Sequence, residues 1–171
     1  MSAIATLEEL LAHAHNLELE AVERYQELAD QMVVHNQPDL VELFRTMVRV
    51  ESLHVDKVRD LAADRELPRL APWGYRWSTL ESPESVPIGG ESYGMTPRRA
   101  LELVLASEER AYAFFAGVAD SSSDPAVHQA ASELAEEERQ HAALLRGWLA
   151  RYPAEADSRE PLDMDEPVEQ D

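Results

Sequence analysis

The sequence contains no cysteine. This absence excludes disulfides, thiolate zinc sites, iron–sulfur clusters and a cysteine nucleophile. Only six of the 171 residues are glycine, which suits a helical protein. Basic residues are also scarce, 15 against 34 acidic ones, and the net charge of −19 disfavours binding to nucleic acid or an anionic membrane. No apolar run approaches the ~20 residues of a membrane-spanning helix.

The beginning of the chain lacks a positively charged segment, because the first basic residue is Arg24. We therefore expect no signal peptide, and a soluble, cytoplasmic protein. Apolar residues make up 44% of the chain, which is enough for one domain with a hydrophobic core.

Four long segments have apolar residues at the spacing of amphipathic helices. Ser, Thr or Asp caps and prolines mark helix starts, and polar or proline-containing stretches mark the ends. The expected starts are Thr6, Pro38, Pro97 and Pro125, and the expected ends lie near His35, Leu67, Asp120 and Tyr152. Thr6 and Glu9 have the spacing of a capping box. Short turns join the helices in pairs, so the sequence predicts an all-α fold of two antiparallel hairpins.

Residues 1–152 are predicted to form a single helical domain. A segment rich in proline and glycine, residues 67–96, separates the hairpins and is long enough to run along a bundle whose helices are ~40 Å long. We interpret it as a crossover strap packed through Trp73, Tyr75 and Trp77, with a substrate lid as the alternative. Residues 153–171 are too acidic and polar to bury, and we expect a disordered tail.

Two pairs with the spacing Glu-x-x-His repeat along the chain. Residues three apart lie on one face of a helix. In each half of the chain, a lone glutamate among apolar residues lies 33 or 30 residues before the pair. The six candidate metal ligands are Glu18, Glu51, His54, Glu108, Glu138 and His141.

Counting from the turn of each predicted hairpin places these six residues at one level near the middle of the bundle. At about 1.5 Å rise per residue, the members of each hairpin lie within ~6 Å along the axis. Their neighbours at helical spacing are apolar, so the four carboxylates should point into the core. Buried carboxylates without partners are strongly destabilising, whereas two divalent cations neutralise four of them. This is the ligand set of carboxylate-bridged di-metal bundles, and it suits iron or manganese.

The other histidines and two tyrosines are assigned lesser roles. We expect surface or helix-end positions for His13, His15, His35 and His128. Tyr25 and Tyr112 are interpreted as core residues, with hydrogen-bond donation to a glutamate or a redox role as the alternative.

At these residues the chain resembles the rubrerythrin-like and bacterioferritin-like proteins of the ferritin-like di-iron superfamily. The resemblance covers residues 6–151 and includes the stretch LELEAVERY at residues 17–25 and both Glu-x-x-His pairs. It implies a ferritin-like four-helix bundle with a long crossover and two iron ions per chain, with manganese or zinc as alternatives. It also implies that Glu51 and Glu138 bridge the metals, that Glu18 and Glu108 are terminal ligands, and that each histidine binds one metal.

Four features of the chain differ from known members of this superfamily and narrow the choice of the member that it resembles. Rubrerythrins carry a cysteine-ligated rubredoxin module, whereas this chain has no cysteine. They also have a second glutamate in the third helix, at a position that is Ala111 here. Bacterioferritins bind haem through a methionine, at a position that is Ser52 here, so no haem is expected. No fifth helix follows Pro153 of the kind that closes ferritin cages. We therefore expect a homodimer rather than a shell.

The predicted function is that of a di-iron oxidoreductase, of ferroxidase or peroxidase type, which binds Fe(II) and reduces O₂ or H₂O₂. One alternative is a non-catalytic protein that binds or stores iron, manganese or zinc. The other is a metal-free helical interaction module.

Overall fold

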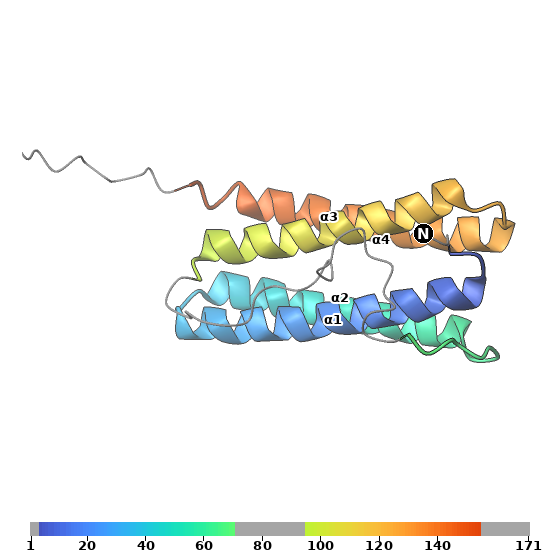
Figure 1. The fold of residues 1–171 in the computed structure, drawn as a ribbon. Helices are drawn as coiled ribbons and strands as arrows, with labels where there is room; N and C mark the ends of the chain where they lie inside the picture. The colour runs from blue at the N-terminus through green and yellow to red at the C-terminus, as the bar shows by residue number, and fades with distance from the viewer. Residues whose placement is uncertain (1–3, 71–94, 155–171) are drawn as a thin grey trace, which may run out of the picture.

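A computed structural model describes residues 4–70 and 95–154. Most of the predicted strap (67–96) and nearly all of the predicted tail (153–171) lie outside the described residues. The described residues form four helices and no strands, as predicted. The helices are α1 (Leu7–Val34), α2 (Pro38–Leu61), α3 (Pro97–Ser121) and α4 (Pro125–Leu149) (Figure 1). None of them is long and apolar enough to cross a membrane.

Side-chain caps fix the start of three helices. Thr6 accepts a hydrogen bond from the Glu9 backbone N–H at the start of α1. The side chains of Thr96 and Asp124 accept hydrogen bonds from backbone N–H groups in the first turns of α3 and α4. The Glu9 side chain accepts from the Ala5 N–H rather than from Thr6, so the predicted capping box is formed one residue off register. Helix α2 has no side-chain cap and begins directly with Pro38.

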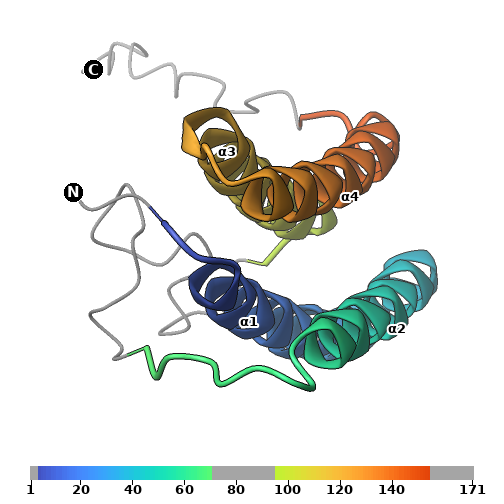
Figure 2. The same ribbon diagram turned by 90° about the vertical axis from the view of Figure 1, so that its right-hand side faces the viewer.

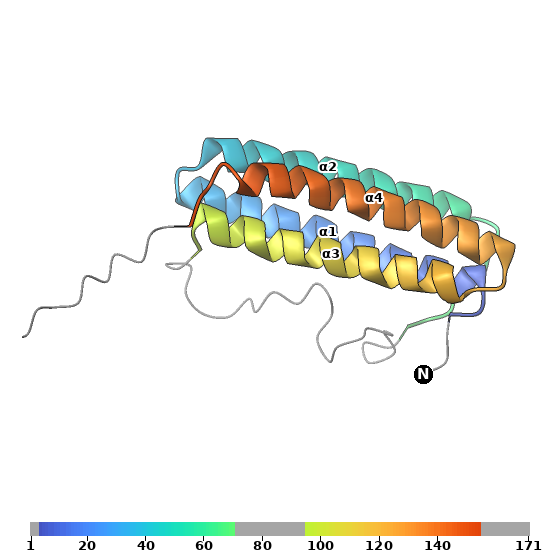
Figure 3. The same ribbon diagram turned by 90° about the horizontal axis from the view of Figure 1, so that it is seen from above.

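The two hairpins form two layers. Seen from one end of the bundle, α3 lies above α1 and α4 above α2 (Figure 2), and all four helices run side by side along the same axis (Figure 3). Close backbone contacts are dense within each hairpin and fewer between the hairpins, which are joined through the side chains of the bundle interior. Asn36, in the tight α1–α2 turn, has a φ of 53°, a left-handed conformation that asparagine tolerates better than most residues.

The hydrophobic core is divided into two clusters, one at each end of the bundle. One cluster joins the start of α1 and the end of α2 to the end of α3 and the start of α4. The other joins the remaining four helix ends. The middle of the bundle, between the clusters, holds the glutamates Glu18, Glu51, Glu108 and Glu138.

Three local predictions were wrong. Helix α2 ends at Leu61 rather than near Leu67, although Ala62 and Leu67, beyond its end, still pack on an end cluster. His13 is buried, at 2% exposure, and its ring lies 5.8 Å from that of Phe114. Tyr112 is exposed rather than part of the core.

Candidate metal centre

Each of the four helices brings one carboxylate into the middle of the bundle. The residues Glu18, Glu51, Glu108 and Glu138 are at most 5% exposed. Each glutamate is flanked on its own helix by residues of the apolar stripe, so burial of the stripe turns the carboxylate inward. The prediction that all four point into the core is confirmed.

His141 lies at the centre of one group of potential ligands. Its Nδ1 atom is 3.1 Å from Glu51 Oε1, 3.5 Å from Glu108 Oε2 and 3.5 Å from Glu138 Oε2. Donor atoms of Glu108, Glu138 and His141 all lie within 4.8 Å of one another, as a shared ion would require.

His54 lies at the centre of the second group. Its Nδ1 atom is 3.3 Å from Glu51 Oε2 and 3.7 Å from Glu18 Oε2. Glu51, His54 and His141 also present donor atoms within 4.8 Å of one another. The two imidazole rings stack at 5.1 Å between centroids, so the groups are adjacent. The structure therefore brings all six predicted residues together. Glu18 belongs to the set because its carboxylate lies near His54.

Five buried donor atoms at this centre lack hydrogen-bond partners within the described residues. The buried atoms in this state are Glu18 Oε1, both carboxylate oxygens of Glu51, His54 Nδ1 and His141 Nδ1. Buried polar groups are nearly always paired, so a convergent set of unpaired ones is typical of a binding site. Carboxylate oxygens and imidazole nitrogens fit iron or manganese. The residues present thus fit the binding of divalent cations.

Comparison with known proteins agrees with this geometry. The family model described as rubrerythrin matches residues 9–149. The chain belongs to the rubrerythrin family. No curated protein matches the sequence.

A crystal structure of an uncharacterized conserved protein from Magnetospirillum magnetotacticum MS-1 is similar to the chain, with a TM-score of 0.76 and 40% sequence identity. The match covers 88% of this chain and 98% of that one. Membership of the rubrerythrin family and the carboxylate–histidine groups together indicate metal binding.

Burial and the interactions among its charged groups together set the pKa values of this rubrerythrin-family centre. Burial raises the pKa of Glu51 to about 8, against the opposing effect of His54. Burial, reinforced by the charge of Glu108, also raises the pKa of Glu138 well above its ordinary value. For His54, burial lowers the pKa, but interactions with Glu18 and Glu51 outweigh it and raise the pKa to about 10. Without metal, the centre therefore retains protons that a cation would displace.

Tyr25 donates a buried hydrogen bond from its hydroxyl to Glu108 Oε1, across from α1 to α3. Burial, followed by the charges of Glu108 and Glu51, raises the pKa of Tyr25 well above its usual value, so the phenol stays neutral and remains a donor. Burial raises the pKa of Glu108, but its contacts with His141, Glu138 and Tyr25 together lower it below the ordinary value. Tyr25 is thus both a core residue and a hydrogen-bond donor to a glutamate, two roles that the sequence offered as alternatives.

Glu137 and Lys57 are neighbours of the centre that sequence reasoning missed. Lys57 Nζ lies 2.5 Å from Glu137 Oε1, and Glu137 Oε2 lies 4.0 Å from His54 Nε2. Both residues fall outside the apolar stripes of their helices, which hides them from a periodicity argument. The run of three glutamates at residues 136–138 is the signal that could have drawn attention to Glu137.

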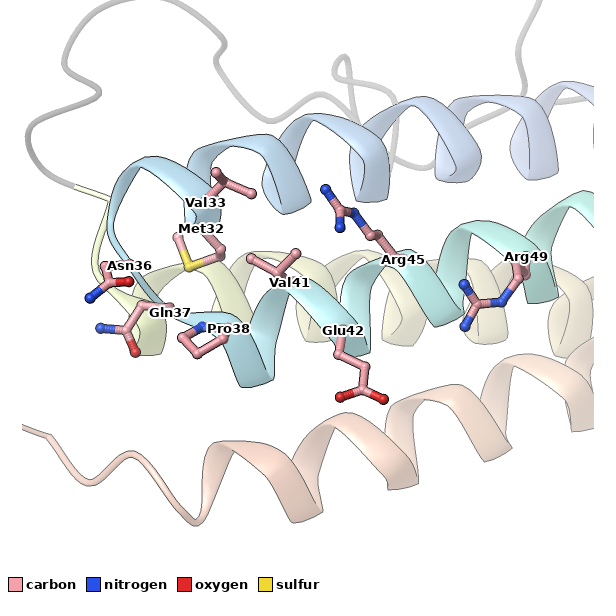
Figure 4. Close-up of a pocket in the computed structure, with 9 residues that line it drawn as sticks. All are labelled: Met32, Val33, Asn36, Gln37, Pro38, Val41, Glu42, Arg45 and Arg49. Atoms are coloured by element: carbon pink, nitrogen blue, oxygen red, sulfur yellow. The ribbon is translucent and has the colours of Figure 1, made fainter.

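A surface hollow at the α1–α2 turn is separate from the metal centre. It has a volume of about 540 Å³ and lies between the end of α1 and the first half of α2 (Figure 4). Its lining includes Met32, Pro38, Arg45 and Arg49, and none of the six predicted ligands.

Proposed function

We propose that the chain is a di-iron oxidoreductase that binds two Fe(II) ions and reduces O₂ or H₂O₂. The observation that carries this proposal is the set of buried, unpartnered donor atoms that four helices bring together. Membership of the rubrerythrin family supports iron as the metal. A bound iron pair would supply two electrons, which with two protons reduce one H₂O₂ to two waters, and an external donor or fresh Fe(II) would restore them.

The protein's part in this function is to hold six donors in fixed positions. Glu51 directs one carboxylate oxygen at each histidine, 3.1 Å to His141 and 3.3 Å to His54, which suits a bridging ligand. By the resemblance to di-iron bundles, Glu138 would be the second bridging ligand, Glu18 and Glu108 would be terminal ligands, and each histidine would bind one metal. Tyr25 restrains Glu108 through its hydrogen bond.

The apolar clusters at both ends of the bundle protect this centre from water along the bundle axis. Exclusion of water strengthens the electrostatic attraction between the carboxylates and the cations. The more open side is at the histidines, since the His54 and His141 side chains are 15% and 10% exposed. We infer that the oxidant approaches there.

Stopped-flow spectroscopy tests the proposal. The metal-free full chain is loaded with two equivalents of Fe(II) without oxygen and mixed with O₂ or H₂O₂, and oxidation is followed by absorbance and oxidant consumption. We expect rapid oxidation with wild-type protein and at least a tenfold slower reaction with Glu51→Ala, while a zinc-loaded sample gives no transient. Stoichiometric iron binding without faster oxidation than free Fe(II) would overturn the enzymatic proposal and leave a binding or storage role.

A further inference from the structure

We propose that Glu137 of α4, held in place by Lys57 of α2, is a positioning residue for His54, and that His141 has no equivalent carboxylate among the residues that the structure describes. The two metal positions are therefore unequal in affinity. This inference rests on the proposed function, because it takes both histidines as metal ligands.

The orientation of His54 leaves one ring nitrogen for an outer partner. Nδ1 faces the carboxylates of Glu18 and Glu51, at 3.7 and 3.3 Å. Nε2 faces away from them, toward Glu137 Oε2 at 4.0 Å. A metal-binding histidine ordinarily donates its second ring N–H to a carboxylate, carbonyl or water, which fixes the tautomer and the orientation of the ring. Glu137 is in position to accept that N–H.

Glu137 has one oxygen engaged and one oxygen free for this contact. Oε1 lies 2.5 Å from Lys57 Nζ, an ion pair that crosses from α4 to α2. Oε2 is buried and has no hydrogen-bond partner within the described residues. An ion pair that holds one oxygen directs the other, so Lys57 keeps Oε2 turned toward His54.

The distance of 4.0 Å is longer than a hydrogen bond, which for N–H···O is about 2.9 Å. A movement of about 1 Å by either side chain closes the gap. The pair lies beside an open hollow of about 700 Å³ that is lined by Lys57 and by one face of α4, so the side chains have room to adjust.

The repeat between α2 and α4 shows that this support is one-sided. Glu51 and His54 correspond to Glu138 and His141 at an offset of 87 residues. At the same offset, Glu137 corresponds to Val50 and Lys57 to Leu144, so both polar partners have apolar counterparts. All carboxylate contacts of His141 within the described part of the chain involve Nδ1.

Loss of an outer partner of this kind typically lowers metal affinity 10- to 100-fold. We therefore expect the removal of the Glu137 carboxylate to weaken the ion at His54 and to leave the ion at His141 nearly unchanged. If the loss of negative charge acted only through general electrostatics, it would instead weaken the binding of both ions.

The test is titration of the metal-free full chain with Co(II), followed by calorimetry and proton NMR. Wild-type protein should bind two Co(II) ions in two resolvable steps, with one slowly exchanging, hyperfine-shifted imidazole N–H. Glu137→Gln should lower one affinity about 10- to 100-fold, keep the other within about twofold, and speed exchange of that N–H. Lys57→Met should change the same step in the same direction by a smaller factor.

The matched control is Glu133→Gln, which removes one exposed carboxylate from α4 one turn away. It should alter neither step by more than about twofold. Equal weakening of both steps by Glu137→Gln, the same loss with Glu133→Gln, or unchanged affinities and N–H exchange would overturn the role of Glu137 while leaving the proposed function intact. Wild-type protein that binds fewer than two Co(II) ions would instead overturn the proposed site and the inference with it.

Discussion

The α1–α2 hairpin and the α3–α4 hairpin supply the same candidate ligands, but the residues around those ligands differ. Each hairpin contributes a lone glutamate and a Glu-x-x-His pair to the middle of the bundle. Seven residues after its lone glutamate, α1 has Tyr25 and α3 has Phe115, and both rings are fully buried. Only the tyrosine can donate a hydrogen bond, and it donates to Glu108 of the other hairpin.

This difference teaches that support for the centre crosses between hairpins. Tyr25 of the first hairpin holds Glu108 of the second, and Glu137 of the second approaches His54 of the first. The two apolar clusters also join the hairpins, one at each end of the bundle. The polar centre is thus the connection between the two halves at mid-bundle, and metal should add to it.

The largest expected effect comes from removing Glu51, whose carboxylate faces both histidines, or Glu138, its counterpart in α4. We expect Glu51→Ala and Glu138→Ala each to lose most of the binding of two metal ions per chain, because each leaves both cations short of a ligand and of charge. Elemental analysis of the purified variants measures this. Glu42→Ala, which removes an exposed glutamate of α2, should retain full metal content. Two ions per chain in both core variants would contradict the ligand assignment.

The stability of the metal-free chain should fall as pH rises from about 5 to 8. Glu51 has a folded-state pKa of about 8 against an ordinary 4.5, so the folded state holds an extra proton in this range and its stability is lost as that proton leaves. The raised pKa of His54, about 10 against 6.5, acts in the same direction. Because one pKa unit corresponds to about 1.4 kcal/mol, we expect the free energy of unfolding to decrease by roughly 3–5 kcal/mol between pH 5 and 8.

Urea unfolding with a chelator at several pH values measures this decrease. Glu51→Gln, which cannot titrate, should have a flatter profile. Metal binding should show the opposite trend, since its ligands must lose protons, and the increase in melting temperature with metal should grow from pH 5 to pH 8. A metal-free protein that becomes more stable over this range would show that Glu51 is ionised in the folded state.

Exchanging the tyrosine and phenylalanine tests the asymmetry directly. Tyr25→Phe should destabilise the chain by about 1–3 kcal/mol, because Glu108 loses a buried hydrogen bond. In the double variant Tyr25→Phe/Phe115→Tyr, we expect part of this loss to be recovered, since Glu18 Oε1 is a buried acceptor without a partner in the described residues. Urea unfolding of both variants measures the difference. A double variant less stable than Tyr25→Phe would show that the two halves are not interchangeable at this position.

The smallest expected effect is at the start of α2. Asp124 caps α4 with its side chain, whereas Gln37 makes no cap hydrogen bond at the corresponding start of α2. Gln37→Asp should therefore stabilise the chain by about 0.5–1 kcal/mol. Thermal unfolding measures the change, with Gln37→Ala as a control expected to have little effect. An equal gain from alanine would indicate that capping is not the cause.

The sequence predicted what depends on position along a single helix. The rise per residue and the apolar stripes brought Glu18 and Glu108 level with the two Glu-x-x-His pairs, and the structure brings all six residues together. The all-α fold and the starts of the helices could be read in the same way.

What the sequence could not predict depends on how helices face one another. Glu137 lies on the polar side of α4, and only the placement of α2 brings His54 and Lys57 to it. His13 is a polar residue, so its burial was not expected from residue type; only the placement of α3 brings Phe114 against it. Tyr112 has the spacing of a core residue, yet it lies at the exposed edge of α3.

The division of the hydrophobic core has a consequence for the order and rate of folding. Most contacts lie within hairpins whose helices are adjacent in sequence, so we expect each hairpin to form early. The two apolar clusters then join the hairpins from both ends, and the ligand layer between them closes last. Interactions that form after the rate-limiting step slow unfolding without speeding folding. Bound metal should therefore lengthen the lifetime of the folded chain while leaving its folding rate nearly unchanged.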